Sequence, residues 1–427
     1  MSERRYPRRL VSAGGGKSGE LRYRSWDSVR QVLGPDEVIG LVEAVGLAGK
    51  GGAGFPTHRK LRLMRAQPGM RKIVVLNGAE HEPGSLKDRH LLQNQPHLVL
   101  EGALILAHAV GAGEVIVAIN QAAPGAMQAF AAAATAAVAA GVDFAGIEVR
   151  IAEVPDHYIV GEETALLEVI EGRAALPRSR PPYPIQQGIQ GAPTLVQNVE
   201  TAAHLPFIVS HGVVPTRESG GDGGGVTLCT LGEEFANPGV FEVPLGMPLR
   251  EILEGLGGGL RNGSAIKAVQ PGGPSSGFLP ASALDVGFDA VSLRNHGSAL
   301  GCAAVRGYSV DTCMVEEIAR IMRFFAEESC GQCPRCRMET GMFDTILRKV
   351  VTGSGTWQLL AQVDKLIELA KGQGKCTLID MPVAPLKTGV ALFRDEFQAH
   401  IEGACSLCAA HDQARLTALQ EQCRGGC

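Results

Sequence analysis

The first half of the chain alternates short apolar runs with longer stretches of helical periodicity. Residues 72–77 (KIVVLN) and 114–119 (EVIVAI) are rich in β-branched side chains and predict buried strands. Helical patterns are found at residues 90–110 and 124–140 and again from about Glu163 onward. One more strand is predicted between them, at residues 147–154. We therefore predict an α/β domain and place it at residues 36–218.

A glycine-rich segment at residues 219–225 (SGGDGGG) predicts a flexible linker after this domain. Beyond it the pattern changes to short strands around one short helix, at residues 226–231, 240–243, 249–256 and 265–269. This order predicts a small α+β module, which we place at residues 226–285.

From Met314 onward the chain has a helical pattern. Apolar side chains recur every three or four residues and share one helix face, at Met314, Ile318, Ile321 and Phe325. The same period returns at residues 360–370 and 386–397. It predicts a helical bundle over residues 310–400, with an N-terminal extension at 1–35 and a cysteine-rich tail at 401–427.

Composition narrows the class of protein. A chain of 427 residues is too long for one ordinary core, so several domains are expected. Its net charge of −4 argues against a nucleic-acid partner. The eleven cysteines gather toward the C-terminus and indicate metal ligands in a reducing compartment, not a secreted disulfide framework. With no signal-peptide pattern and only an alanine-rich apolar stretch at 122–142, we expect a cytoplasmic protein without direct membrane insertion, peripheral at most to a membrane complex.

Three cysteines form a C-x-x-C-x-x-C run, Cys330, Cys333 and Cys336, and Cys376 follows forty residues later. A cubane iron–sulfur cluster needs one terminal thiolate for each of its four irons, and two-residue spacers let neighbouring thiolates reach neighbouring corners. Zinc sites more often pair two C-x-x-C knuckles, so the run favours a [4Fe–4S] cluster. Four ordinary buried cysteines are the alternative. One-electron chemistry is the leading hypothesis.

A glycine-rich segment near the N-terminus contains Gly49, Gly51, Gly52 and Gly54, followed by Phe55. Glycines allow the backbone to approach a ligand closely and to point N–H groups at phosphate oxygens. The spacing G-x-G-G-x-G is not that of a Rossmann fingerprint, and a predicted helix, not a strand, precedes it. Taken alone, the segment is at least as well explained as an ordinary loop.

The glycine segment is followed by motifs in a recognisable order, at residues 77–84 (NGAEHEPG), 158–164 (YIVGEET), 178–184 (RSRPPYP), 197–201 (QNVET) and 328–337 (ESCGQCPRCR). With these motifs the chain resembles the NADH-binding flavoprotein subunit of respiratory complex I and the related diaphorase subunits of soluble NAD-linked enzymes. The resemblance runs from about residue 36 to about residue 400.

The resemblance implies a fold and a function. The expected fold is a non-Rossmann α/β domain that binds FMN and NADH, then a β-grasp module, then a helical bundle with a [4Fe–4S] cluster. The expected activity is NADH dehydrogenase: hydride passes from NADH to FMN, and electrons then leave singly through the cluster to a partner redox protein. Family members normally work beside a thioredoxin-like [2Fe–2S] subunit or other subunits of a larger complex.

The resemblance also assigns residues. Around FMN it places the glycine loop, Lys60 against the flavin, and Asn77, Glu80, Tyr158, Gly161, Glu162, Asn198 and Thr201. Nearer NADH it places Phe55, Glu82, Glu163, Arg180 and Tyr183, of which Glu82 and Glu163 are the expected catalytic carboxylates. Some of these residues could instead be structural: Tyr158 as a core tyrosine, Arg180 as a solvated charge, and the acidic residues as favourable neighbours of a helix N-terminus.

The chain departs from the complex I pattern at several positions, Ala79, His58, Leu61, Gln197, Arg180 and Tyr183. Residues 51–61 and 77–83 look more like the C subunit of the Rnf complex, which also carries FMN. The alternatives are therefore an Rnf-type or electron-bifurcating subunit that links NAD(H) with ferredoxin, or a non-catalytic relay or β-grasp scaffold. NADPH instead of NADH would need a cation for its 2′-phosphate, for which Arg59, Arg62 and Arg180 are available.

The tail contains Cys405-x-x-Cys408 and Cys423-x-x-x-Cys427. Four thiols at this spacing would hold Zn²⁺ or a second iron–sulfur cluster, with His411 as a substitute ligand. Exposed thiols without a metal are the competing interpretation.

Overall fold

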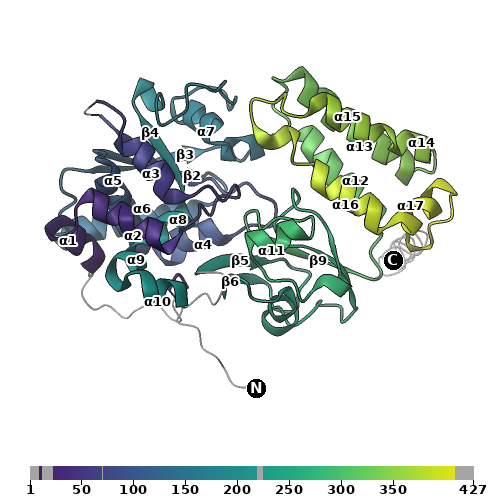
Figure 1. The fold of residues 1–427 in the computed structure, drawn as a ribbon, viewed down its shortest axis with the longest axis horizontal. Helices are drawn as coiled ribbons and strands as arrows, with labels where there is room; N and C mark the ends of the chain where they lie inside the picture. The colour runs from purple at the N-terminus through teal and green to yellow at the C-terminus, as the bar shows by residue number, and fades with distance from the viewer. Residues whose placement is uncertain (1–8, 12–22, 70, 219–224, 409–427) are drawn as a thin grey trace, which may run out of the picture.

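The computed structural model describes residues 9–11, 23–69, 71–218 and 225–408. Figure 1 shows a sheet-and-helix domain on the left, a helical bundle on the upper right and a second sheet between and below them. The predicted linker lies outside the described residues except for Gly225, and so does the tail beyond Cys408.

The first sheet has four parallel strands in the order β3-β2-β1-β4. Their bounds are β1 Ile73–Gly78, β2 Glu114–Asn120, β3 Glu148–Val154 and β4 Thr194–Asn198. Alternate side chains of β1 enter different cores, because successive residues of a strand point to opposite faces. Val74 and Leu76 pack with helix α5, whereas Ile73 and Val75 pack with helix α7.

Ten α-helices and two 3₁₀-helices of the described chain belong to this domain: α1 Arg24–Gln31, α2 Pro35–Val45, α3 Thr57–Arg65, α4 Lys87–Asn94, α5 Pro96–Val110, α6 Pro124–Ala139, η1 Tyr158–Gly161, α7 Glu163–Ile170, η2 Ile189–Gly191, α8 Val199–Ala203, α9 Leu205–His211 and α10 Val213–Glu218. The central helix α5 approaches α8 closely at Gly102, where a Cβ atom would lie 2.1 Å from the carbonyl oxygen of Ala202. Glycine is therefore required there for the two helices to pack.

The second sheet is mixed and has the strand order β6-β5-β9-β7-β8. Its elements are β5 Val226–Leu231, β6 Gly239–Pro244, η4 Glu251–Leu256, β7 Ile266–Gln270, β8 Leu279–Pro280, η5 Ala281–Ala283, α11 Ala290–Asn295 and β9 Ala304–Ser309. Strand β9 pairs in parallel with β5 and antiparallel with β7, so the sheet continues past residue 285.

The remaining elements form the bundle: α12 Met314–Glu327, α13 Pro334–Val351, α14 Trp357–Leu360, α15 Gln362–Ala370, η6 Thr377–Ile379, α16 Val383–Leu392 and α17 Arg394–Ile401. The predicted apolar face of the first helix is confirmed, since Met314, Ile318, Ile321 and Phe325 are all buried.

The structure differs from the predicted elements in three places. The helix predicted over residues 90–110 is two helices, because Gln95 precedes Pro96 and adopts φ −133° and ψ 42°. The expected N-terminal extension contains helix α1, whose Trp26 is fully buried. Strands β4, β8 and β9 had no counterpart in the pattern of apolar residues. Within the described ranges, we find no helix with the length and apolar character needed to cross a bilayer.

Candidate functional site

The motifs that lie far apart in the sequence meet at the carboxyl edge of the parallel sheet. The β1–β4 register places Asn77 opposite Asn198. The Asn77 amide donates to the carbonyl oxygen of Gly161 at 3.0 Å, and the Asn198 side chain accepts from the backbone N–H of Glu200 at 3.0 Å and so caps α8. Loops beyond the carboxyl ends of parallel strands are where α/β proteins place their ligands.

The glycine loop, residues 49–54, lies against the same edge. The backbone N–H of Lys50 donates to the Thr201 hydroxyl at 2.9 Å. A Cβ atom on Gly51 would lie 3.3 Å from the Cβ of Asn198, and Gly52 has φ +106°, which L-residues with side chains rarely adopt. The loop, Asn77, Gly161, Asn198 and Thr201 together form what we call the strand-end group. The structure thus brings these predicted flavin residues together.

A buried lysine, which the sequence did not reveal, supports this group. The Lys87 ammonium contacts Asp88 at 2.9 Å, Glu200 at 3.0 Å and the Asn198 side-chain oxygen at 3.2 Å. Burial alone would raise the pKa of Glu200, but the attraction of Lys87 and of its other cationic neighbours lowers it. Glu200 lies inside the motif QNVET, and the only sequence signal was a charged residue in an otherwise apolar helix.

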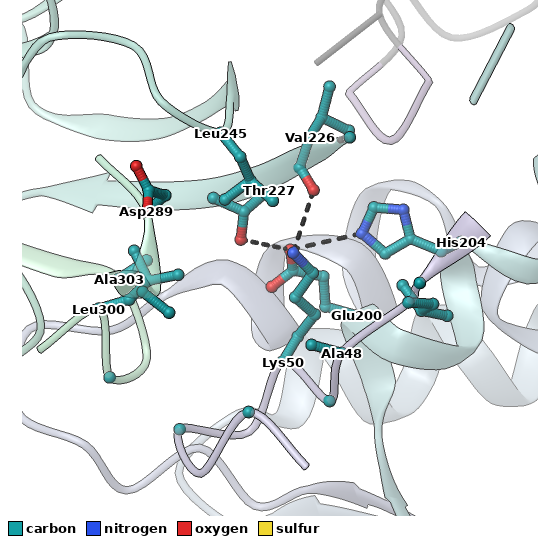
Figure 2. A pocket seen from close by; sticks show the side chains of 18 of the residues that line it. Ala48, Lys50, Glu200, His204, Val226, Thr227, Leu245, Asp289, Leu300 and Ala303 are labelled. Carbon is teal, nitrogen blue, oxygen red and sulfur yellow. Dashed lines mark hydrogen bonds and ion pairs between the residues drawn. The ribbon is translucent and has the colours of Figure 1, made fainter. Parts of the chain in front are cut away.

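A cavity of about 730 Å³ lies between the glycine loop and the second sheet (Figure 2). Its polar lining includes Lys50, Lys87, Glu200 and His204, with Thr227 and Asp289 from the second module. Gly49, Gly52 and Gly54 also line it, whereas Asn77, Tyr158 and Glu162 do not. The cavity therefore includes the glycine loop but not all of the predicted flavin residues.

Glu80 and Glu82 follow β1. Glu80 has φ +45°, and its carboxylate accepts from the Ser85 hydroxyl and from the backbone N–H groups of Asp88 and Arg89, each at 2.8 Å. Burial raises its pKa to about 7. Glu80 therefore holds the N-terminus of α4, which is a structural role; its contact with FMN stays a prediction.

Glu82 differs because half of its carboxylate is unsatisfied. One oxygen accepts from the Tyr158 hydroxyl at 3.0 Å, while the other, Oε1, is buried without a hydrogen-bond partner. A Cβ atom on Gly273 would lie 2.4 Å from that oxygen, so the second module covers it. Burial raises the pKa of Glu82 to about 7. A buried oxygen without a hydrogen-bond partner lowers the stability of the fold, so its presence indicates a position where a ligand would donate a hydrogen bond.

The adjacent carboxylates at the start of α7 have different environments. Glu162 is the N-cap and accepts from the backbone N–H groups of Thr164 and Ala165, each at 2.9 Å, so the structural role at a helix terminus holds for this residue. Glu163 pairs with Lys60 at 2.9 Å and with Arg180 at 3.4 Å, and Arg180 also contacts Glu162. These predicted residues therefore form one charged cluster.

Phe55 and Tyr183, the two predicted aromatic contacts of NADH, are 48% and 49% exposed. Neither ring stacks on another ring among the described residues. Free aromatic faces of this kind are suited to stacking on a planar base.

The four predicted cluster ligands surround one small cavity, and we call Cys330, Cys333, Cys336 and Cys376 the cysteine centre. Three of them lie between the end of α12 and the first turn of α13. Cys333 is the N-cap of α13, where the helix dipole favours a thiolate. The backbone N–H of Lys375 donates to the Cys333 sulfur at 3.4 Å.

A single short helix connects the two sites. Ile159 of η1 lines the cavity of the cysteine centre, while Gly161 of the same helix accepts from Asn77 in the strand-end group. The backbone N–H of Tyr158 donates to the Glu328 carboxylate at 3.2 Å, and Glu328 is the C-cap of α12, two residues before Cys330. Both sites therefore share η1 as a wall.

Two of the predicted tail cysteines lie in the described part of the chain, and they have neighbours from elsewhere in the bundle. Cys405 and Cys408 lie beside Cys313 and His400. Cys423, Cys427 and His411 lie outside the described residues. Cys313 and His400 were missed because more than 80 residues separate them in the chain.

A parallel sheet with a glycine loop at its carboxyl edge, next to a four-cysteine centre, defines an iron–sulfur flavoprotein. Comparison with known families supports this class. Residues 42–206 match the Nuo51 FMN-binding domain, 230–279 the SLBB domain, and 316–400 the NADH-ubiquinone oxidoreductase-F iron–sulfur binding region.

The chain is similar over nearly its whole length to the F 2 subunit of NADH-quinone oxidoreductase from Rhizobium meliloti, with 38% identity over 91% of this chain and 93% of the relative. The F subunit of the Escherichia coli NADH-quinone oxidoreductase is 38% identical over 87% of this chain and 85% of its own. Among solved structures, the NAD⁺-reducing [NiFe]-hydrogenase in its air-oxidised state matches with a TM-score of 0.81 and 30% identity, covering 90% of this chain and 67% of that one. The chain belongs to the family of NADH-quinone oxidoreductase F subunits.

Family membership confirms the predicted class of enzyme. The protein is an NADH-oxidising electron-input subunit with FMN and a [4Fe–4S] cluster as its cofactors. The relatives match over most of the chain, whereas the likeness to the Rnf C subunit concerned only two short segments.

The glycine loop generates a first prediction. Gly52→Val should reduce the FMN content of the purified protein to a small fraction, because valine rarely adopts φ +106° and would displace the loop. Flavin absorbance after purification measures this. Gly113→Val is the matched control, since Gly113 has no atoms within 4 Å of its Cβ position and should keep FMN. Normal FMN content in Gly52→Val would remove the loop from the site.

The pKa of Glu82 generates a second prediction. Because burial raises this pKa from 4.5 to about 7, the neutral carboxyl stabilises the fold at low pH and this contribution is lost as the pH rises toward and through about 7. Glu82→Gln should therefore lessen the fall in thermal unfolding temperature of FMN-free protein between about pH 5 and pH 8. Glu148→Gln, at an exposed strand end, should leave this fall unchanged. Equal pH dependence in wild type and Glu82→Gln would contradict a titrating buried carboxyl.

Proposed function

We propose that the strand-end group holds FMN, that the cysteine centre holds the [4Fe–4S] cluster, and that electrons pass between them across η1. The observation that carries the proposal is the shared wall: Ile159 and Gly161, two residues apart, face the cysteine cavity and Asn77 respectively. When bound, FMN supplies two-electron uptake from NADH and release of single electrons, and the cluster relays single electrons.

The residues present fit a flavin. The glycine loop has two positive-φ glycines, Gly52 and Gly54, so its backbone can approach a ligand without Cβ atoms in the way. The unpartnered Oε1 of Glu82 is a buried acceptor for a hydroxyl or amide donor. Lys60 and Arg180 place two cations beside Glu163, where negative charge that develops on a reduced flavin would be stabilised.

The cysteine centre fits a cubane cluster. Four free thiols converge on one cavity, and backbone and side-chain donors reach two of the sulfurs: Lys375 reaches Cys333, and Gln332 reaches Cys330 at 3.8 Å. Hydrogen bonds to the sulfurs are one of the levers by which a protein sets the cluster's potential.

For the nucleotide, we propose that Phe55 and Tyr183 stack on the adenine and that Glu82 and Glu163 contact the ribose hydroxyls and the nicotinamide. The support is the exposure of the two aromatic rings, the acidic side chains of the two glutamates and the resemblance of the motifs. Carboxylates near the ribose would repel a 2′-phosphate, so NADH is the proposed donor.

We also propose how the chain is divided and what it works with. The FMN/NADH domain takes residues 36–218, a β-grasp module extends from 226 to the end of β9 at Ser309, and the iron–sulfur bundle takes 310–400. Because the similar proteins are subunits of NADH-quinone oxidoreductases, the proposed partners are other redox subunits, among them a thioredoxin-like [2Fe–2S] protein, in the cytoplasm. Pull-down from the native host, followed by iron and acid-labile sulfide analysis, tests this assembly.

Cys333→Ser should abolish the broad visible absorbance of the cluster and leave the bleaching of FMN by NADH largely intact, because the two cofactors occupy different cavities. Anaerobic spectra before and after NADH addition measure both effects. Cys229→Ala, at a buried cysteine of β5 away from the centre, is the control and should keep the cluster. Absence of iron above trace in anaerobically purified wild type would show the cluster assignment to be wrong.

NADH should reduce the bound flavin far faster than NADPH at equal concentrations, and Glu82→Gln should slow reduction by NADH more than by NADPH. Anaerobic stopped-flow titration with both nucleotides gives the rates. Glu148→Gln should change neither rate. Equal rates with both donors would remove Glu82 and Glu163 from nucleotide selection, and no reduction by either would defeat the dehydrogenase assignment.

A further inference from the structure

Four side chains at the far end of the bundle converge on one point. Cys313 is the N-cap of α12, His400 is in the last turn of α17, and Cys405 and Cys408 follow that helix. Their ligand atoms all lie within 4.8 Å of one another. We call Cys313, His400, Cys405 and Cys408 the C-terminal quartet.

The distances fit one ion. With Zn–S bonds of about 2.3 Å, two ligands of the same ion lie at most about 4.6 Å apart, and roughly 3.8 Å apart in a tetrahedron. The observed separations are 3.1 Å from the Cys313 sulfur to His400 Nε2, 3.5 Å from His400 Nε2 to the Cys408 sulfur, and 3.4 Å from the Cys405 sulfur to the Cys408 sulfur. No other described group of three or more such ligands is this compact, and the cysteine centre is not.

The quartet is not explained by ordinary packing. Cys313 and His400 are 2% and 4% exposed, and the imidazole lies between two thiols. All four sulfur and nitrogen donors are of the types that bind zinc, and none of the three cysteines forms a disulfide. The Glu316 carboxylate lies 3.3 Å from the Cys408 sulfur, so ionised thiolates here need a cation to offset the negative charge.

We propose that the C-terminal quartet binds one structural Zn²⁺ ion. Three thiolates and one imidazole complete a tetrahedron and leave no open position for substrate, which is the arrangement of structural zinc sites. A cubane cluster is disfavoured, because each of its four thiolates must reach a different iron and the ligands must then surround a wider cage.

The ion would join the first and last helices of the bundle. Glu396 of α17 already accepts from the backbone N–H of Met314 at 2.8 Å and from Lys267 of β7 at 2.9 Å, so the ends of α12, α17 and the second sheet converge here. Zinc would fix the N-terminal end of α12, whose C-terminal end leads into the cysteine centre. This proposal needs neither FMN nor NADH, so it stands or falls separately from the proposed function.

Metal analysis of the holoprotein by mass spectrometry tests the site. The expected result is about one zinc and about four irons per chain. Cys405→Ser with His400→Ala should lower the zinc content about tenfold or more while iron and FMN are retained. Cys229→Ala is the matched control, because that buried cysteine is not part of the quartet, and it should keep zinc.

A second measurement does not depend on whether the variants fold. Wild type in which zinc has been exchanged for Co²⁺ should show the intense ligand-field and thiolate charge-transfer bands of tetrahedral sulfur coordination. Zinc below trace in wild type, or zinc content unchanged in the double variant, would overturn the proposal. So would loss of iron instead of zinc in that variant, which would indicate a second iron–sulfur cluster.

Discussion

The buried ammonium of Lys87 is the constraint on which the arrangement of the two sheets depends. A lysine without water is tolerated only when charged and polar partners surround it. Asp88 and Glu200 supply the charges, and Glu200 also accepts from the backbone N–H of Leu228 at 2.9 Å and from the Thr227 hydroxyl at 3.0 Å. One charged network therefore joins α4, α8 and β5. Removal of the Lys87 ammonium would leave the buried carboxylates of Asp88 and Glu200 without their shared cation.

This network also determines where the glycine loop can lie. Asn198 contacts Lys87 with its side-chain oxygen and Asp88 with its amide at 2.6 Å, so these two contacts fix the orientation of its side chain. Gly51 packs directly on Asn198, and Lys50 donates to Thr201 in the same segment. The loop thus rests on a rigid base, which is what a ligand-binding backbone requires if its N–H groups are to hold a fixed geometry.

Local signals in the sequence were sufficient for some features and insufficient for others. Strands β1 and β2 are continuous apolar runs, and the cysteine run is a contiguous motif, so both were predictable. Strand β4 is only five residues long and includes Gln197 and Asn198, so its pattern did not stand out. The apolar pattern at residues 90–110 predicts one helix, but Pro96 disfavours the helical conformation at Gln95 and so divides the segment into two helices.

The pattern of apolar and polar residues does not predict features that tertiary contacts create. Lys87 resembles any surface lysine in the sequence, and only the packing of α4 against α8 shows that it is buried. Cys313 and His400 carry no spacing signal, so the sequence groups Cys405 and Cys408 only with the cysteines that are nearby in the chain. The sequence likewise does not show that η1 forms a wall of both sites, although Tyr158 and Gly161 are among the predicted site residues.

The cavity behind the glycine loop has a consequence for biosynthesis. Its walls come from residues 45–54 near the start of the chain and from residues 298–303 much later. During translation the loop leaves the ribosome long before Cys302 and Ala303 exist, so the cavity stays open on one side until the second sheet has folded. A ligand that occupies it would enter late in synthesis or after release, and its retention would report that β5 and β9 have paired.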